Sequence, residues 1–278
     1  MRRSDVSRDL FDISGRTVIV TGGAGLLGRE YGRALVVAGA QVVLADIDGP
    51  AVEAVADGLR GRAGSVIGVA VDVADESSVV RLVRTTVAHY GRIDGLVNNA
   101  ALDPKFDRGR KSQHAAAFEH YPIDCWNSAL AVNLTGMFLC SREVAPTMLA
   151  QGRGVIVNIS STYGLVGPDQ RIYNSDRTDA PREFKPVVDS VTNSGVLGFT
   201  RYLAAYWGNT GIRVNTLTPG GVRNEQAPEF VRRYSARTPL GRMAERHEYS
   251  GALLFLLSDA SSYMTGGNLI VDGGWTAW

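Results

Sequence analysis

The chain has 278 residues, of which 45% are hydrophobic, and its net charge is +1 at pH 7. This size and apolar content suit one large domain with a substantial core. The balanced charge argues against nucleic acid or an anionic membrane as a partner, and no run of about 18 apolar residues predicts a transmembrane helix.

The first residues and the low number of cysteines indicate the cellular compartment of the protein. Residues 1–12 are charged and lack the apolar stretch of a secretory signal. Cys125 and Cys140 are the only cysteines. Both fall in a predicted helix, so we expect buried thiols and no disulfide. The four histidines have no ligand spacing, and no metal site is predicted. These observations favour a cytoplasmic protein.

The first elements in the chain predict a nucleotide site. A β-branched strand over 17–20 precedes a glycine-rich turn, a helix to residue 38 and a second strand over 41–45. The turn carries Gly22, Gly25 and Gly28, and Asp46 follows the last of them by 18 positions. Such glycines let the backbone approach a pyrophosphate at a helix N-terminus, and the acidic residue binds ribose hydroxyls.

Asp46 also distinguishes between the two nicotinamide dinucleotides. A carboxylate accepts hydrogen bonds from the 2′-hydroxyl of NAD and repels the 2′-phosphate of NADP. Neither position 45 nor position 47 carries an arginine that would reverse this preference. NAD(H) is therefore favoured over NADP(H).

The alternation of strands and helices continues to the end of the chain. We expect further strands over 65–71, 93–97, 154–159, 212–217 and 268–271. We expect helices over 76–90, 123–150, 187–207, 228–236 and 245–258. This order predicts an α/β fold, a single-domain Rossmann-like doubly wound parallel sheet of about seven strands with helices on both faces. Ligands should bind at the carboxyl ends of the strands.

The whole chain, 1–278, is interpreted as this one domain. Residues 1–14 are an N-terminal extension. Residues 101–121 and 162–187 are expected to be loops on the substrate side, and residues 219–244 a lid-like loop and helix.

Several motifs together resemble the short-chain dehydrogenase/reductase family over almost the whole length. In chain order they are Thr21-Gly22 to Gly28, Asp72-Val73, Asn98-Asn99-Ala100, Asn133, Ser161 and Pro219-Gly220-Gly221-Val222. Residues 99–105 and 271–278 are more narrowly similar to oxidoreductases of the flagellin-modification and nucleotide-sugar group.

The resemblance implies roles for individual residues. Asn133 and Ser161 match two members of the family's catalytic tetrad. The implied cofactor contacts are Thr21, Gly22, Gly25, Leu27, Gly28, Asp46, Ile47, Asp72, Val73, Asn99, Ala100, Asn193, Pro219, Gly220 and Val222. The resemblance also implies a homo-oligomer, either a tetramer or a dimer.

The serious departure from the family lies in the helix that begins near residue 187. The family motif there is Tyr-x-x-x-Lys, and the aligned residues are Asp189 and Asn193. A tyrosine has an unperturbed pKa of about 10 and an aspartate about 3.9, so Asp189 is expected to be a carboxylate that cannot give a proton to a ketone. Asn193 can bond ribose hydroxyls but carries no charge.

Other polar residues near this helix have alternative interpretations. Tyr173 follows Ser161 by 12 positions, a familiar spacing for the catalytic tyrosine, but we expect a substrate-loop tyrosine. Tyr163 is expected to form a pocket wall. Lys185 lies one helical turn before Asp189, and a solvated lysine is the favoured interpretation. Asp103 and Lys105 either bind a polar substrate or solvate a loop.

Three hypotheses follow. The first is an NAD(H)-binding enzyme for a polar, sugar-like or natural-product intermediate. In it Asn133 and Ser161 polarise the substrate and Asp189 acts as charge stabiliser or base, and the reaction could be non-redox. The second is an inactive NAD-binding partner subunit. The third is an ordinary NAD-dependent oxidoreductase in which tyrosine and lysine were replaced.

Overall fold

A computed structural model describes residues 10–102, 117–174 and 183–278. Its centre is an all-parallel sheet of seven strands in the order β3-β2-β1-β4-β5-β6-β7. The strands are β1 (Thr17–Thr21), β2 (Gln41–Asp46), β3 (Ser65–Ala70), β4 (Gly95–Asn98), β5 (Gly154–Ile159), β6 (Ile212–Pro219) and β7 (Asn268–Val271). The predicted single-domain, doubly wound fold is confirmed.

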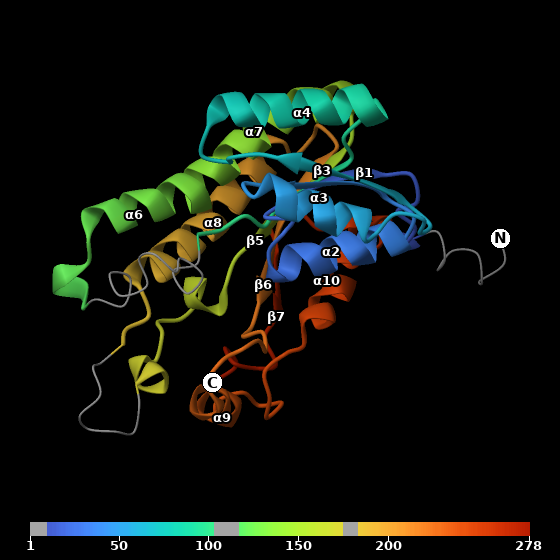
Figure 1. The fold of residues 1–278 in the computed structure, drawn as a ribbon. Helices are drawn as coiled ribbons and strands as arrows, with labels where there is room; N and C mark the ends of the chain where they lie inside the picture. The colour runs from blue at the N-terminus through green and yellow to red at the C-terminus, as the bar shows by residue number, and fades with distance from the viewer. Residues whose placement is uncertain (1–9, 103–116, 175–182) are drawn as a thin grey trace.

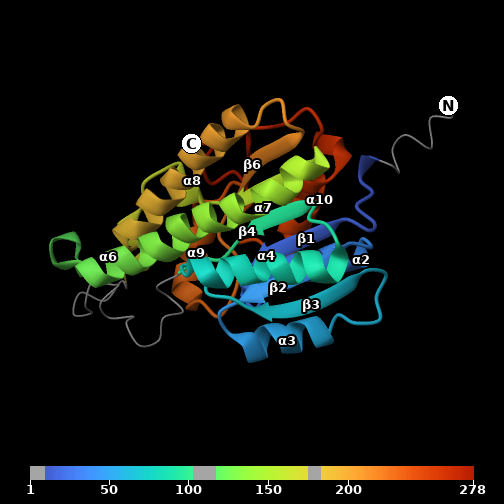
Figure 2. The same ribbon diagram turned by 90° about the horizontal axis from the view of Figure 1, so that it is seen from above.

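Helices cover both faces of the sheet (Figures 1 and 2). They are α2 (Leu26–Val37), α3 (Gly49–Asp57), α4 (Glu76–Tyr90), α6 (Ile123–Leu130), α7 (Met137–Gln151), α8 (Val187–Tyr206), α9 (Pro228–Ala236) and α10 (Ser250–Leu257). A π-helical segment, Ala131–Gly136, joins α6 to α7. Short 3-10 turns include η3 (Thr162–Gly164), η4 (Gln170–Tyr173) and η5 (Arg246–Tyr249).

Alternating side chains of the strands build one apolar core on each face. In β1, Val18 and Val20 join the cluster that contains α2 and α10, whereas Ile19 joins the cluster that contains α4, α7 and α8. The period of two along a strand sends neighbouring side chains to opposite faces. Both faces are therefore buried, as expected for a parallel sheet.

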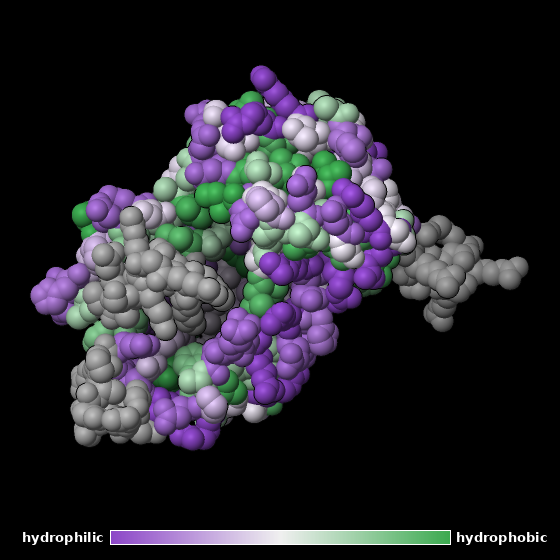
Figure 3. All heavy atoms as spheres, in the orientation of Figure 1, coloured by the Kyte–Doolittle hydropathy of each residue, from purple (hydrophilic) through white to green (hydrophobic). Residues whose placement is uncertain are grey.

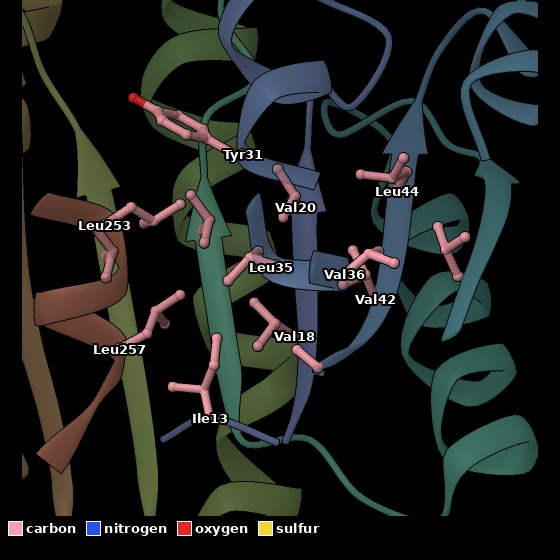
Figure 4. Packing of buried hydrophobic residues seen from close by; sticks show 14 of the residues in the cluster. Ile13, Val18, Val20, Tyr31, Leu35, Val36, Val42, Leu44, Leu253 and Leu257 are labelled. Atoms are coloured by element: carbon pink, nitrogen blue, oxygen red, sulfur yellow. The ribbon is translucent and has the colours of Figure 1, made fainter. Parts of the chain in front are cut away.

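The cluster beneath α2 and α10 is closely packed, as Figure 4 shows. Leu35 and Val36 of α2 are fully buried, and Leu253 of α10 is as well. Each such side chain contributes about 1.5–3 kcal/mol through burial. This buried core fixes the positions of the strands. The loops that follow the carboxyl ends of the strands are where a ligand is expected to bind.

Two details of the helices differ from the sequence prediction. The segment between β2 and β3 contains α3, which was not predicted from the sequence. Gly49-Pro50 suggests a break, but proline is tolerated in the first helical turn, and Asp48 caps this helix by accepting from the N–H of Ala51 at 3.0 Å. The helix expected over 245–258 is divided into η5 and α10.

No helix in the described ranges is long and apolar enough to cross a lipid bilayer. Both cysteines are free and buried in the described part of the chain, as predicted.

Candidate active site

A cavity of about 420 Å³ opens at the carboxyl ends of the strands. Its walls come from the residues that follow β1, β2, β4, β5 and β6, together with the start of α8 and part of α9. Because parallel strands end at one edge, residues far apart in sequence meet here. Figure 3 shows apolar and hydrophilic residues interspersed over the face of the molecule seen in Figure 1.

The glycine turn after β1 forms one end of the cavity. Gly22 has φ +65°, a left-handed conformation that favours glycine, and a Cβ there would lie 2.9 Å from the Cα of Ala100. A Cβ on Gly28 would lie 2.0 Å from the carbonyl oxygen of Gly22. Helix α2 starts after Gly25 without a side-chain cap. The uncapped first turn and the close backbone packing fit a dinucleotide pyrophosphate.

The carboxylate of Asp46 stands beside this turn at the end of β2. Its Oδ2 accepts a hydrogen bond from the N–H of Ala24 at 2.9 Å, and Oδ1 accepts one from Asp48 at 3.1 Å. These bonds fix the carboxylate at the cavity wall, and each oxygen retains a lone pair. The arrangement fits recognition of two ribose hydroxyls.

Thr21 and Asn99 stabilise the glycine turn through hydrogen bonds to main-chain atoms. The Thr21 hydroxyl oxygen accepts from the N–H groups of Asn99 and Ala100, each at 3.0 Å. The Asn99 amide donates to the carbonyl oxygens of Thr21 at 2.9 Å and Gly22 at 3.2 Å. The strand-end asparagine therefore holds the shape of the turn and also lines the cavity.

The cavity collects most, but not all, of the residues predicted to touch a cofactor. Those that line it are Gly22, Gly25, Leu27, Asp46, Asn99, Ala100, Asn193, Pro219, Gly220 and Val222. Those that do not are Thr21, Gly28, Ile47, Asp72 and Val73. Ile47 is 74% exposed, and Val73 packs where a Cβ on Gly136 would stand. Asp103 and Lys105 lie outside the described residues.

Asn133 sits in the π-helical segment and faces the cavity. Its Oδ1 accepts from the N–H of Leu102 at 2.7 Å, and its Nδ2 donates to the hydroxyl of Thr192 at 3.3 Å. Asn133 thus ties the loop after β4 to α8. Such a π-helical turn is frequent at functional sites.

Ser161 follows β5 and caps the short turn η3. Its hydroxyl accepts from the N–H of Tyr163 at 3.3 Å. The turn is pressed against α8, because the Ser160 hydroxyl donates to the carbonyl oxygen of Asn193 at 3.0 Å and a Cβ on Gly164 would lie 2.7 Å from the same carbonyl. This contact brings Ser161 and the start of α8 to one side of the cavity.

The first turn of α8 carries an ion pair instead of a lone carboxylate. The ammonium of Lys185 contacts Oδ2 of Asp189, and the two side chains are only 9% and 10% exposed. The favoured interpretation of Lys185 as a solvated lysine is therefore wrong. Lys185 lies in the segment just before α8 and reaches Asp189 in its first turn, and both residues line the cavity.

The amide of Asn193 is turned back onto its own helix. Its Nδ2 donates to the carbonyl oxygen of Asp189 at 2.7 Å. Because the residue also lines the cavity, its Oδ1 is the atom that remains to accept a hydrogen bond from a ligand.

Two tyrosines meet across the cavity wall. The hydroxyl oxygens of Tyr163 and Tyr173 are 2.6 Å apart, and the ammonium of Lys185 lies 5.8 Å from the centre of the Tyr163 ring. Burial raises the pKa of Tyr163 well above its usual range, and the neighbouring Tyr173 raises it further. Tyr163 is therefore a neutral phenol at physiological pH.

Some cavity residues were not predicted from the sequence. Thr192 anchors Asn133, and Tyr234 accepts from the N–H of Gly221 at 2.6 Å while its ring stacks on Trp275 with centres 4.1 Å apart. The spacing of Phe230 and Tyr234, four residues apart in α9, was a usable sign of an inward-facing stripe. Within the described ranges, no group of three potential metal-ligating side chains gathers.

Comparisons with known proteins agree with this architecture. Residues 16–175 match the family model described as short chain dehydrogenase, and residues 185–276 match one described as enoyl-(acyl carrier protein) reductase. A 2,5-dichloro-2,5-cyclohexadiene-1,4-diol dehydrogenase of Sphingobium indicum is 35% identical over 96% of this chain and 99% of its own length. A D-threitol dehydrogenase of Mycolicibacterium smegmatis is 34% identical over 96% of this chain and 95% of its own.

Solved structures give the same result. A gluconate 5-dehydrogenase from Burkholderia cenocepacia, in complex with NADP and tartrate, has a TM-score of 0.83 and 29% identity over 98% of this chain and 99% of its own. An NAD+-bound xylitol dehydrogenase has a TM-score of 0.81 and 26% identity over 94% of this chain and 99% of its own. The family models together span most of the chain, and the chain belongs to the short-chain dehydrogenase family.

Proposed function

We propose that this chain is an NAD(H)-dependent oxidoreductase that interconverts a hydroxyl and a carbonyl group on a polar, sugar-like small molecule. One observation carries the proposal. The glycine turn, Asp46, Asn133 and Ser161 border the same cavity as the buried pair of Lys185 and Asp189. A dinucleotide platform and a polar reaction site therefore adjoin.

The preference for NAD(H) is supported by the carboxylate of Asp46. A 2′-phosphate would bring like charges together at this wall, whereas a 2′-hydroxyl can donate to the carboxylate. Related structures hold NADP in one case and NAD+ in another, so the family alone does not decide between them.

Each polar residue has a chemical part in the proposal. A nicotinamide ring bound in this cavity accepts or supplies the hydride. The Ser161 hydroxyl donates a hydrogen bond to the substrate oxygen and polarises it, and Asn133 holds the loop that faces it. Asp189 and Asn193 occupy the positions of the family's tyrosine and lysine. Asp189 stabilises charge through the ammonium of Lys185, and Asn193 accepts from a ribose hydroxyl.

The proposed substrate class is a polyol or cyclic diol. Relatives are named as dehydrogenases of D-threitol and of a chlorinated cyclohexadienediol. The cavity supports this class because Ser161, Tyr163 and Tyr173 bring hydroxyl groups that donate and accept, beside an ion pair whose charges compensate.

A second candidate is a subunit that binds NAD(H) without catalysing a reaction. The observation in its favour is the Asn193 amide, which is bonded to its own helix and cannot replace an ammonium. This candidate predicts cofactor binding together with no turnover.

Two measurements test the proposal. Calorimetric titration should show that NADH binds more tightly than NADPH and that Asp46→Asn removes most of this difference. Turnover of D-threitol, xylitol and gluconate with NAD+ should be detectable in the parent protein by nicotinamide absorbance. If NADH does not bind, the proposal fails. If NADH binds but only the double variant Asp189→Tyr/Asn193→Lys turns over substrate, the non-catalytic candidate is correct.

Several expectations stay predictions. Residues 101–121 and 162–187 are proposed as the substrate side and residues 219–244 as the lid. The homo-oligomer and the cytoplasmic location belong with them. The relatives reported above are dehydrogenases of other substrates and do not support the narrower likeness to flagellin-modification and nucleotide-sugar enzymes.

A further inference from the structure

The paired phenols of Tyr163 and Tyr173 have so far been given only a hydrogen-bonding role toward the substrate. We infer that Tyr163 is the group that gives a proton to the substrate oxygen, or takes one from it, in place of a tyrosine at position 189. This inference rests on the proposed function and names the residue that completes its chemistry.

The position of Tyr163 is set by the same turn that positions Ser161. Ser161 caps η3, and the N–H of Tyr163 donates to its hydroxyl at 3.3 Å. The turn is bonded to α8, since the Ser194 hydroxyl donates to the carbonyl oxygen of Gly164 at 3.0 Å. Tyr163 and Ser161 are therefore held close together in one turn, and both line the cavity.

Tyr173 supplies a hydrogen-bond partner for the phenol. The 2.6 Å separation of the two hydroxyl oxygens is short, within the range of strong O–H···O bonds. The ring of Tyr173 is held by Phe230 of α9, with ring centres 5.4 Å apart. When Tyr163 loses its proton, the Tyr173 hydroxyl can turn and donate to the phenolate.

Lys185 and Asp189 act on Tyr163 as positioning residues. The ammonium lies 5.8 Å from the ring centre, and the carboxylate of Asp189 fixes it there. The ammonium lowers the pKa of Tyr163 and favours the phenolate, whereas the carboxylate of Asp189 acts in the opposite direction with a smaller effect. Asp189 cannot itself donate the proton, because a carboxylate paired with an ammonium is an acceptor only.

The proton step balances in both directions. In reduction, the carbonyl carbon receives the hydride from the reduced nicotinamide, and the carbonyl electron pair moves to the oxygen. The O–H bond of Tyr163 breaks and a new O–H bond forms on the substrate. Burial raises the pKa of Tyr163 and makes the phenol a weaker acid, so the step needs the ammonium of Lys185 and the hydroxyl of Tyr173 to stabilise the phenolate. In oxidation, the same bonds form and break in reverse.

A spectroscopic experiment tests the inference without a known substrate. Difluorotyrosine, whose phenol ionises near neutral pH, is placed at position 163 and titrated by fluorine NMR in the full chain. The charged and titratable groups that face it are Tyr173, Lys185, Asp189 and Tyr234. We expect saturating NAD+ to lower the pKa of the label and Lys185→Met to raise it. The same label at the exposed position 202 should respond to neither.

A kinetic experiment tests the same group by a second route. With D-threitol and NAD+, Tyr163→Phe should lower kcat by about 10²–10⁴-fold with little change in NADH affinity, because one general acid–base group is lost. Tyr202→Phe removes an exposed phenol and should leave kcat unchanged.

The outcomes separate this inference from the proposed function. If calorimetry shows no NADH binding, both the proposed function and the inference are wrong. Two results overturn only the inference, provided that NADH binds. In the first, neither NAD+ nor Lys185→Met changes the pKa of the label at position 163. In the second, Tyr163→Phe keeps the parental kcat.

Discussion

The two halves of the cavity are built in different ways. The nucleotide half rests on backbone geometry, because its glycines pack against carbonyl groups and its asparagine bonds main-chain atoms. The substrate half rests on side chains from separate elements, namely Tyr163 of η3, Tyr173 of η4 and the pair of Lys185 and Asp189. Backbone packing leaves few alternatives, whereas a side-chain cluster can exchange one group for another.

This difference predicts that the two halves tolerate substitution unequally. A change at the glycine turn disturbs the packing of the backbone itself. A change at the start of α8 alters charge and reach, and neighbouring side chains can compensate for it. Lys185, one turn before Asp189, provides a compensating charge here.

The largest effect is expected from breaking the buried ion pair of the substrate half. Lys185→Met leaves the Asp189 carboxylate buried without its ammonium and should lower the free energy of unfolding by about 3 kcal/mol. The double variant Lys185→Met/Asp189→Leu removes both charges and should recover most of this loss. Chemical denaturation measures both. Equal stability of the single variant and the parent would show that the pair is not buried in solution.

A slightly smaller effect is expected in the nucleotide half from Gly28→Ala. The new Cβ would overlap the carbonyl oxygen of Gly22, 2.0 Å away, so the turn must open. We expect a loss of stability of about 2 kcal/mol and a loss of NADH binding in calorimetry.

The matched control for this variant is Gly198→Ala in α8. A Cβ at Gly198 meets nothing within 4 Å, and alanine is the better helix former by about 1 kcal/mol. This variant should bind NADH as the parent does and be slightly more stable. If Gly28→Ala behaves like Gly198→Ala, the backbone account of the nucleotide half is wrong.

These two halves also differ in how far the sequence predicted them. The turn and Asp46 could be predicted because glycine spacing and the strand-end acid reflect local geometry. The burial of Lys185 could not, because it depends on packing between η3, η4 and α8, which are brought together only by the fold. Helix α3 was missed for a local reason, since Gly49-Pro50 resembles a break and its proline in fact occupies the first helical turn.

A moderate effect is expected at the cofactor wall. Asp46→Asn keeps the size of the side chain but removes its charge, so the ratio of NADPH to NADH affinity should rise about tenfold, equivalent to about 1.4 kcal/mol. Calorimetric titration with both cofactors gives this ratio. An unchanged ratio would mean that Asp46 does not face the 2′ position.

The smallest effect is the pH dependence of the stability that Asp169 contributes next to η4. The Arg171 guanidinium beside Asp169 lowers the pKa of this carboxyl to about 2, and Arg237 of the α9 region acts in the same direction. A lowered pKa adds stability above the ordinary aspartate value of 3.8, and this contribution is lost as the pH falls from there through about 2.

Asp169→Asn should therefore cost about 1 kcal/mol at pH 7 and almost nothing at pH 2. Thermal unfolding of the parent and the variant across this range measures the difference. A difference that stays constant with pH would contradict the ionic link between η4 and the α9 region.

The central claim is that Asp189, through Lys185, supports hydride transfer in a site that lacks the helix phenol. The most direct test is kcat/KM for NAD+-dependent oxidation of the best polyol among D-threitol, xylitol and gluconate, compared between the parent and Asp189→Asn. Calorimetry of NADH binding confirms that the variant is folded. We predict a loss of about 10²-fold with unchanged NADH affinity. Equal kcat/KM values in the two proteins would contradict the claim.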